Sequence, residues 1–294
     1  MNPIPYWVSQ LGPQRLAGFG RVPIPNTRQP TQSEDSMETS DVRSDDMLPD
    51  LPTLTDPDLT WITIILDRSG SMASARESTV AGFNEFVRDQ KKLPGQARLK
   101  LVQFDDQYDE VFDLPLSEVP ELTQDTFVPR GWTALYDAQG KTITTLQENI
   151  SKLSSAERPS KVVIVTLTDG MDNKSKEYSK TSIASLNDKM KNEYKWQLVY
   201  LGANQDAVAV GGGMNYFTSQ SLSYKMDRMG QAMNVASSSV SRLRSMSPIS
   251  FSRLAPSEVE EVMAFTEEER KIAIGKPDDK DAVNPAVTSR SDNA

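Results

Sequence analysis

Three short segments of the chain are apolar at almost every position, and they restrict the possible folds more than any other feature. They are residues 61–66 (WITIIL), 162–167 (VVIVTL) and 197–201 (QLVYL). A strand that is apolar on both faces is typical of a parallel sheet that helices cover on both sides, because neither face then meets water. The three segments therefore predict the central strands of an α/β protein.

The segments between these strands have the spacing of helices and of one β-hairpin. Residues 74–93, 134–153 and 180–194 carry apolar side chains three and four positions apart, which predicts helices. Residues 97–114 predict two strands joined by a turn near Asp105. The resulting order, β-α-β-β-α-β-α-β-α-β, predicts a doubly wound, Rossmann-like, three-layer α/β fold. Its central sheet is expected to be mostly parallel, with one antiparallel edge strand.

Composition divides the chain into four parts: a polar N-terminal linker, a domain, a short helical extension and a polar tail. Their bounds are 1–57, 58–246, 247–275 and 276–294. We expect both ends of the chain to be disordered, because they lack apolar periodicity. The apolar residues from Ile4 to Leu11 belong either to a short docking segment or to a free tail.

The end of the predicted domain carries apolar residues at helical spacing. The stripe consists of Leu222, Met226, Met229, Met233, Ala236, Val240 and Leu243. Its spacing predicts one helix over residues 221–246 that packs on the sheet, with the last strand before it at residues 215–218 (NYFT). We expect three basic residues at and after this helix, Arg242, Arg244 and Arg253, to have no carboxylate nearby. They form either a solvated helix end or a patch for an acidic partner.

The residue types that are missing exclude several classes of site. The sequence contains no cysteine and no histidine, which excludes disulfides, thiolate and imidazole metal sites, and catalysis by Ser-His-Asp or Cys-His groups. The formal net charge of −9 argues against a general nucleic-acid-binding protein. No apolar run approaches the roughly 18 residues of a membrane span. The N-terminus also lacks an apolar signal core, so we expect a soluble, cytoplasmic protein without a membrane partner.

Oxygen-bearing side chains follow two of the central strands and precede one helix. Asp67, Ser69 and Ser71 follow the first strand, Asp169 follows the second, and Thr133 stands before a helix. Ligands of doubly wound folds bind at the carboxyl ends of the strands, so these side chains can meet in one crevice. A site with only oxygen donors favours Mg²⁺, with Mn²⁺ or Ca²⁺ as alternatives. Five protein groups that carry two charges leave a position for a further oxygen, and a carboxylate from a partner suits that position best.

Each of these residues also has an ordinary structural interpretation. An Asp or Ser after a strand is commonly a helix N-cap, Thr133 can cap its own helix, and the tripeptide Thr168-Asp169-Gly170 is common in turns. Taken singly, the structural interpretation is favoured. The occurrence of the whole set at the ends of predicted strands favours a cation site instead.

The pattern D-x-S-x-S, followed by T and then D, resembles the metal-ion-dependent adhesion site (MIDAS) of von Willebrand factor A (vWA) domains. The resemblance covers residues 58–245 and includes the segments LDRSGSM, TALYDA, TDGMDNKSKEYS and YLGANQDAVAVG. It is closest to intracellular-type members from bacteria and their phages. It implies a Mg²⁺ site whose hydroxyls bind directly and whose carboxylates bind mainly through water or one oxygen. The residues that match are Asp67, Ser69, Ser71, Thr133 and Asp169.

The resemblance also implies features around the site. Trp132 takes the place of a small residue that the family usually carries before the threonine, and we expect it to narrow the site. Asp172 and Asn173 are interpreted as loop residues within reach of a ligand. In some members the last helix shifts when ligand binds. The methionine-rich stripe described above is compatible with a coupled helix and with a static one.

The function that the resemblance implies is a Mg²⁺-dependent adhesion or adaptor module that captures an Asp or Glu side chain of a partner protein, without enzymatic activity and without nucleic acid. Two alternatives are a structural or accessory component of a phage particle and an adaptor of a separate AAA+ ATPase, since the chain has no G-x-x-x-x-G-K-[ST] motif. A phosphatase-like hydrolase that uses Asp67 is disfavoured, because Ser69 stands where such enzymes carry a second aspartate. We expect the host cytoplasm or, for a phage protein, the virion.

Overall fold

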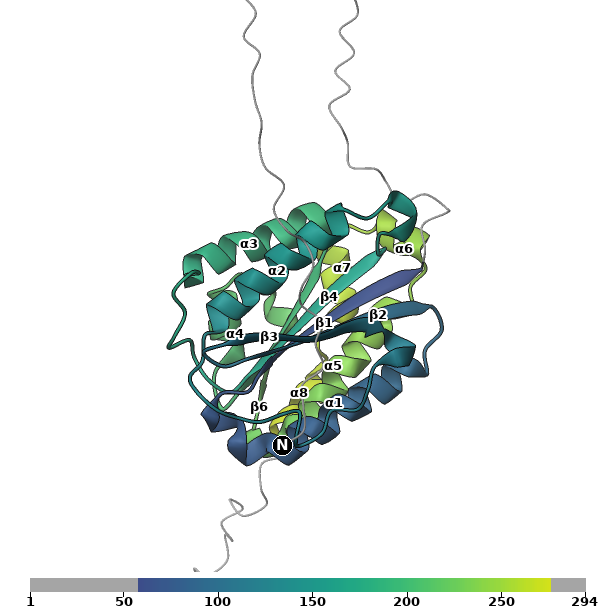
Figure 1. Cartoon of the computed structure of the whole chain (residues 1–294). Coiled ribbons are helices and arrows are strands. Elements are labelled where there is room, and N and C mark those ends of the chain that lie inside the picture. The colour runs from purple at the N-terminus through teal and green to yellow at the C-terminus, as the bar shows by residue number, and fades with distance from the viewer. Residues whose placement is uncertain (1–57, 276–294) are drawn as a thin grey trace, which may run out of the picture. The chain divides into compact units, whose positions relative to one another are not determined.

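A computed structural model describes residues 58–275 of the chain. The predictions for residues 1–57 and 276–294, including the docking segment and the tail, lie outside the described residues. Figure 1 shows the described part as a sheet between two layers of helices. None of its helices combines the length and the hydropathy of a membrane span.

The sheet contains six strands in the order β3-β2-β1-β4-β5-β6. Their bounds are Leu59–Asp67 (β1), Gln96–Phe104 (β2), Tyr108–Pro115 (β3), Lys161–Thr168 (β4), Gln197–Ala203 (β5) and Ser221–Tyr224 (β6). All neighbours are parallel except β2 and β3, which are antiparallel at one edge. The predicted fold class is therefore confirmed. The strand order reverses between β1 and β4, which is where doubly wound sheets open a crevice for ligands.

Two helical layers cover the faces of the sheet, as Figure 1 shows. Helices α1 (Arg76–Lys91) and α5 (Met229–Arg244) cover one face, and α2 (Leu135–Ser151), α3 (Lys180–Tyr194) and the short α4 (Ala207–Gly212) cover the other. The alternation within β1 explains both layers. Ile62 and Ile64 belong to the α1/α5 core, whereas Trp61 and Ile65 belong to the α2/α3 core. A strand that is apolar on both faces thus serves two cores at once.

The last part of the predicted domain differs from the expectation of a single helix. Leu222 lies on β6, Met226 lies in a 3-10 turn, and α5 begins only at Met229. Residues 215–218 are not a strand. The spacing of Leu222 fits a helix equally well, but Ser221–Tyr224 satisfies the backbone groups along the free edge of β5, and this tertiary pairing decides its conformation.

Three further helices follow α5: α6 (Pro248–Arg253), α7 (Pro256–Met263) and α8 (Glu267–Ile274). Phe251, Val259 and Ala273 belong to the same apolar core as α1 and α5. The extension at residues 247–275, which was expected to be short and helical, contains these three helices. The break between α7 and α8 falls where Thr266 caps α8 by accepting a hydrogen bond from the backbone N–H of Glu269 at 3.2 Å.

The basic residues near the end of α5 do not form one open patch. Arg242 forms an ion pair with Glu269 at 2.7 Å, so the expectation that it has no carboxylate nearby is wrong. That partner lies 27 residues further along the chain, and only the packing of α8 on α5 brings it close. Arg244 is buried, and Arg253 is exposed.

Candidate metal site

The candidate site lies at the carboxyl edge of the sheet, where the strand order reverses. Asp67 is the last residue of β1, and Asp169 directly follows β4. The two strands are neighbours, and Leu66 of β1 pairs with Leu167 of β4. Because the strands are parallel and in register, both end at the same edge of the sheet. This brings together two acidic residues that are 102 positions apart in the sequence.

Asp67 is completely buried, and both of its carboxylate oxygens accept hydrogen bonds. Oδ1 accepts from the backbone N–H of Ser69 at 2.6 Å, and Oδ2 accepts from the hydroxyl of Thr168 at 2.6 Å. Burial raises the pKa of Asp67 to about 6, even though these hydrogen bonds oppose the shift; the charge of Asp169 adds to it. Within residues 58–275, no cationic side chain forms an ion pair with this buried carboxylate, and a bound cation would stabilise its charged form.

A chain of hydrogen bonds through Ser69 and Ser71 connects Asp67 to Asp169. The hydroxyl oxygens of Ser69 and Ser71 are 3.1 Å apart, and the Ser71 hydroxyl donates to Oδ1 of Asp169 at 2.8 Å. Partial burial raises the pKa of Asp169 as well, against the hydrogen bonds from the two serines. Ser71 is exposed, whereas Ser69 is buried, so the cluster opens to solvent on the side of Ser71 and Asp169. Four of the five predicted site residues thus form one hydrogen-bonded group.

The fifth predicted residue, Thr133, is buried beside this group. Its backbone N–H donates to Oδ1 of Asn173 at 2.9 Å, and the N–H of Asn173 donates back to the carbonyl oxygen of Thr133 at 2.9 Å. A Cβ atom placed on Gly170 would lie 3.5 Å from the Thr133 hydroxyl oxygen. The Thr133 hydroxyl therefore lies against the loop that begins at Asp169.

Hydrogen bonds in both directions join the loop after β4 to the amino end of α2, and with it to Thr133. Asp137 accepts hydrogen bonds from the backbone N–H groups of Lys176, Glu177 and Tyr178 at 2.8–2.9 Å. In return, Asp172 accepts from the N–H of Tyr136 at 3.3 Å. Asp172 and Asn173 therefore brace the loop itself. The ligand contact that was expected of them stays a prediction.

An ion-pair cluster holds the other side of the Thr133 loop. Asp105 is completely buried and accepts from Nε of Arg68 at 3.1 Å and from Nε of Arg130 at 2.8 Å. Burial by itself would raise the pKa of Asp105, but the hydrogen bonds and the charges of the two arginines outweigh it and hold the pKa below its usual range. The N–H of Ala134 donates to the carbonyl oxygen of Asp105 at 2.8 Å. The cluster therefore ties the Thr133 loop to the ends of β1 and β2.

Sequence reasoning did not identify these supporting residues. Thr168 and Asp105 were interpreted only as parts of a strand end and a turn, and Arg68 was not interpreted at all. A signal was present in the sequence for Arg68, because it follows Asp67 directly and a charged residue at the end of an apolar strand needs a partner. The identity of that partner, 37 residues away, is decided by the contact between the loops.

The donor set fits a hard divalent cation. All five candidate ligands offer oxygen, and two of them carry a negative charge, which matches the charge of the ion. Within residues 58–275 no group of three or more acidic residues is placed to hold a metal, so a site built on carboxylates alone does not arise there. A metal held at this place would therefore also need the hydroxyls of Ser69, Ser71 and Thr133.

Two large apolar side chains stand exposed beside the site. Trp132, which precedes Thr133, is 60% exposed, and Met171, which follows Gly170, is 67% exposed. The ammonium group of Lys174 lies 5.8 Å from the centroid of the Trp132 ring. Trp132 was expected to narrow the site; its high exposure shows that much of its side chain faces solvent.

Comparison with known proteins gives only distant likenesses. No protein-family model matches the sequence, and no curated protein matches it either. Proximal thread matrix protein 1 from the mussel byssus is 15% identical, with a TM-score of 0.46, over 64% of this chain and 47% of that chain. A structure of the same protein with a zinc-occupied MIDAS motif is 15% identical, with a TM-score of 0.44, over 61% and 47%. The ArnB paralog VWA2 from Sulfolobus acidocaldarius is 17% identical, with a TM-score of 0.39, over 61% and 45%.

The chain thus spans less than half of the length of these proteins. Likenesses at these identities and TM-scores assign neither a family nor a function to it.

Proposed function

We propose that this chain is a protein-binding module of the vWA type. In it, Asp67, Ser69, Ser71, Thr133 and Asp169 would hold a divalent cation. Mg²⁺ is the first candidate, and Mn²⁺ or Ca²⁺ are alternatives. The observation that carries the proposal is the hydrogen-bonded group that runs from Asp67 through Ser69 and Ser71 to Asp169. This group spans β1 and β4 at the point where the strand order reverses, which is where such folds bind ligands.

The charge of the donor set suggests what the partner presents. When bound, the cation would act as a Lewis acid whose positive charge is only just balanced by the two carboxylates. The three hydroxyls are neutral, so an additional anionic oxygen is favoured over another neutral one. We therefore propose that the partner is a protein that offers the carboxylate of an Asp or Glu side chain. The open side of the cluster, at Ser71 and Asp169, is where that group would approach.

The exposed rim supports a macromolecular partner over a free small acid. Trp132 and Met171 expose most of their surface within two residues of proposed ligands. Aromatic residues and methionine are enriched at protein interfaces, and tryptophan is prominent among the residues that contribute most to binding energy. We propose that these two side chains contact the partner around its acidic residue.

We propose no catalytic activity for this site. Ser69 stands where a metal-dependent phosphatase-like enzyme would carry a second aspartate. Its hydroxyl is engaged with that of Ser71, and its backbone N–H is engaged with Asp67.

The decisive experiment is titration calorimetry of Mg²⁺ and Mn²⁺ into the wild type, Asp67→Ala and the control Asp125→Ala. Asp125 is an exposed acid outside the proposed donor set, so its loss removes the same charge without touching the site. We expect the affinity to fall at least about tenfold in Asp67→Ala, about 1.4 kcal/mol, and to stay unchanged in the control. Equal affinity in Asp67→Ala and the wild type would refute the site.

A second measurement tests the partner. The wild type and Asp67→Ala are used to capture host proteins with and without EDTA. A partner retained only by the wild type, and only without EDTA, supports cation-dependent recognition. A partner that is retained equally by Asp67→Ala binds elsewhere on the chain.

A further inference from the structure

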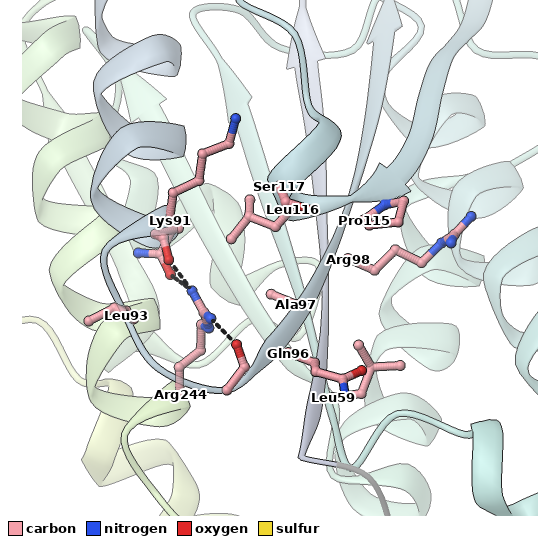
Figure 2. Close-up of a pocket in the computed structure, with 12 residues that line it drawn as sticks. Leu59, Lys91, Leu93, Gln96, Ala97, Arg98, Pro115, Leu116, Ser117 and Arg244 are labelled. Carbon is pink, nitrogen blue, oxygen red and sulfur yellow. Dashed lines mark hydrogen bonds between the residues drawn. The ribbon is translucent and has the colours of Figure 1, made fainter.

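A cavity of about 630 Å³ lies at the opposite edge of the sheet from the candidate metal site. It is formed where β1 and β2 begin, where α1 ends, and where Arg244 reaches in from the end of α5. Figure 2 shows these elements around it, with Arg244 beside the end of α1 and Leu59 and Gln96 at the starts of their strands. Its volume falls within the range of about 300–1,000 Å³ that is usual for small-molecule sites.

The lining of this cavity is cationic, although the chain as a whole carries a net charge of −9. Lys91, Arg98 and Arg244 line it, and none of its lining residues is acidic. Arg98 is neutralised by an ion pair with Asp113. Lys91 donates to the backbone carbonyl oxygen of Val119 at 3.0 Å. One of the three cations therefore has a counter-ion, and Lys91 has only a neutral acceptor.

Arg244 is the most unusual of the three, because its residue is only 5% exposed. Each of its hydrogen bonds goes to a neutral oxygen. It donates to the backbone carbonyl of Gln90 at 2.6 Å and to that side chain's amide oxygen at 3.2 Å. It donates more weakly to the carbonyls of Pro94 at 3.4 Å and Gly95 at 3.3 Å. Asp58, whose charge also acts on Arg244, forms its own ion pair with Lys161 at 3.0 Å.

Within residues 58–275, Arg244 forms no salt bridge. A buried charge without a counter-ion is unfavourable, and buried charges in proteins are usually paired. Among the residues that line the cavity, the other ionisable side chains are Lys91 and Arg98, so none of them supplies a carboxylate. Burial accordingly lowers the pKa of Arg244. An anion that enters the cavity would compensate this charge.

We propose that this cavity binds a small organic anion, whose carboxylate or phosphate group approaches Arg244, while Lys91 adds positive charge at another part of the lining. The planar guanidinium suits both head groups, and the lysine adds a second positive charge. Leu93 and Leu116 line the same cavity and provide an apolar surface for the remainder of the ligand. Because the cavity and the candidate metal site lie at opposite edges of the sheet, this proposal does not depend on cation binding.

The test is calorimetric titration of the full chain with phenyl phosphate, with phenylacetate and with the neutral phenylacetamide, all at the same ionic strength. We expect saturable binding of at least one of the two anions, and the tighter of them identifies the head group. Phenylacetamide should bind at least about tenfold more weakly, because it lacks the charge. Binding of the anion should persist in EDTA and in Asp67→Ala.

Variants locate the binding. We expect Lys91→Gln to lower the affinity for the anion by at least about tenfold. Lys152 is an exposed lysine elsewhere on the surface, and Lys152→Gln should leave the affinity unchanged. Arg244→Gln should abolish binding, with circular dichroism to show that the variant is folded; if it is not, Lys91→Gln decides the matter. The proposal is overturned if neither anion saturates, if phenylacetamide binds equally well, or if Lys152→Gln weakens binding as much as Lys91→Gln.

Discussion

Replacing Asp67 by asparagine should stabilise the cation-free protein and abolish its response to Mg²⁺. Asp67 is completely buried at the end of β1. Asparagine has nearly the same shape, and its carbonyl oxygen can still accept the hydrogen bond from the N–H of Ser69. The hydroxyl of Thr168 can rotate to accept from the amide instead of donating to the carboxylate. The substitution therefore removes the charge and keeps the packing.

The sign and size of the effect follow from the pKa. Burial raises the pKa of Asp67 from 3.8 to about 6, so the folded state prefers the protonated carboxyl. This contribution to stability is fully present below the unfolded value, and it is lost as the pH rises through the folded value. Each pKa unit is worth about 1.4 kcal/mol, so the loss at neutral pH is about 3 kcal/mol at most. The uncharged variant should regain about 1–3 kcal/mol of this free energy of unfolding.

Urea denaturation in EDTA at neutral and at acidic pH measures the effect. The variant should be the more stable protein at neutral pH, and the difference should close near pH 4, where the wild-type carboxyl is protonated. With Mg²⁺ at about 100 times its dissociation constant, the wild type should gain about 2.7 kcal/mol and the variant nothing. Asp125→Asn, an exposed substitution of the same kind, should change neither value. A variant that is less stable than the wild type in EDTA at neutral pH would refute the reasoning.

Four further outcomes are expected. Mg²⁺ affinity should fall as the pH drops below about 6, because protons compete for the carboxyl of Asp67; calorimetry that finds a constant affinity between neutral pH and about pH 5 would contradict this. Trp132→Ala should weaken a partner captured in the EDTA-sensitive assay by about tenfold or more while Mg²⁺ affinity stays the same; a parallel loss of both would assign Trp132 to the cation site instead. Gly82→Val should lower the free energy of unfolding, measured by thermal denaturation, by about 1–3 kcal/mol, because a Cβ there would lie 3.1 Å from Cα of Gly230 on α5. Gly230→Ala is the control, since a Cβ at Gly230 has no neighbour within 4 Å. Adding Mg²⁺ with a carboxylate ligand should change hydrogen exchange only in the amino-terminal half of α5, because the turn before it contacts the Ser71 loop whereas α7 and α8 hold the other half. If exchange protection of α5 is the same with and without the ligand, the helix is static.

Local sequence was sufficient to predict the central strands and to place the five candidate ligands at one end of the sheet; that they bind a metal stays a prediction. Strands such as β1 are apolar on both faces, and that pattern has one common explanation, a parallel sheet between two helical layers. Once the strands are in place, a parallel sheet carries all of their carboxyl ends to one edge. Asp67 and Asp169 could therefore be placed together without knowledge of any contact between them.

Tertiary structure decided what depends on partners distant in the chain. Leu222 fits a helical spacing, yet it lies on β6 because the edge of β5 offers backbone hydrogen bonds that a helix at that place would leave unmade. Arg242 pairs with Glu269 on α8, and Arg68 pairs with Asp105, which is 37 residues away in the sequence. The cavity around Arg244 could not be predicted from the sequence either, because the residues that line it come from α1, α5 and the first three strands. Periodicity reports which face of a segment avoids water, whereas the pairing of charges and the shape of a cavity depend on which segments meet, and that is determined only when the layers pack.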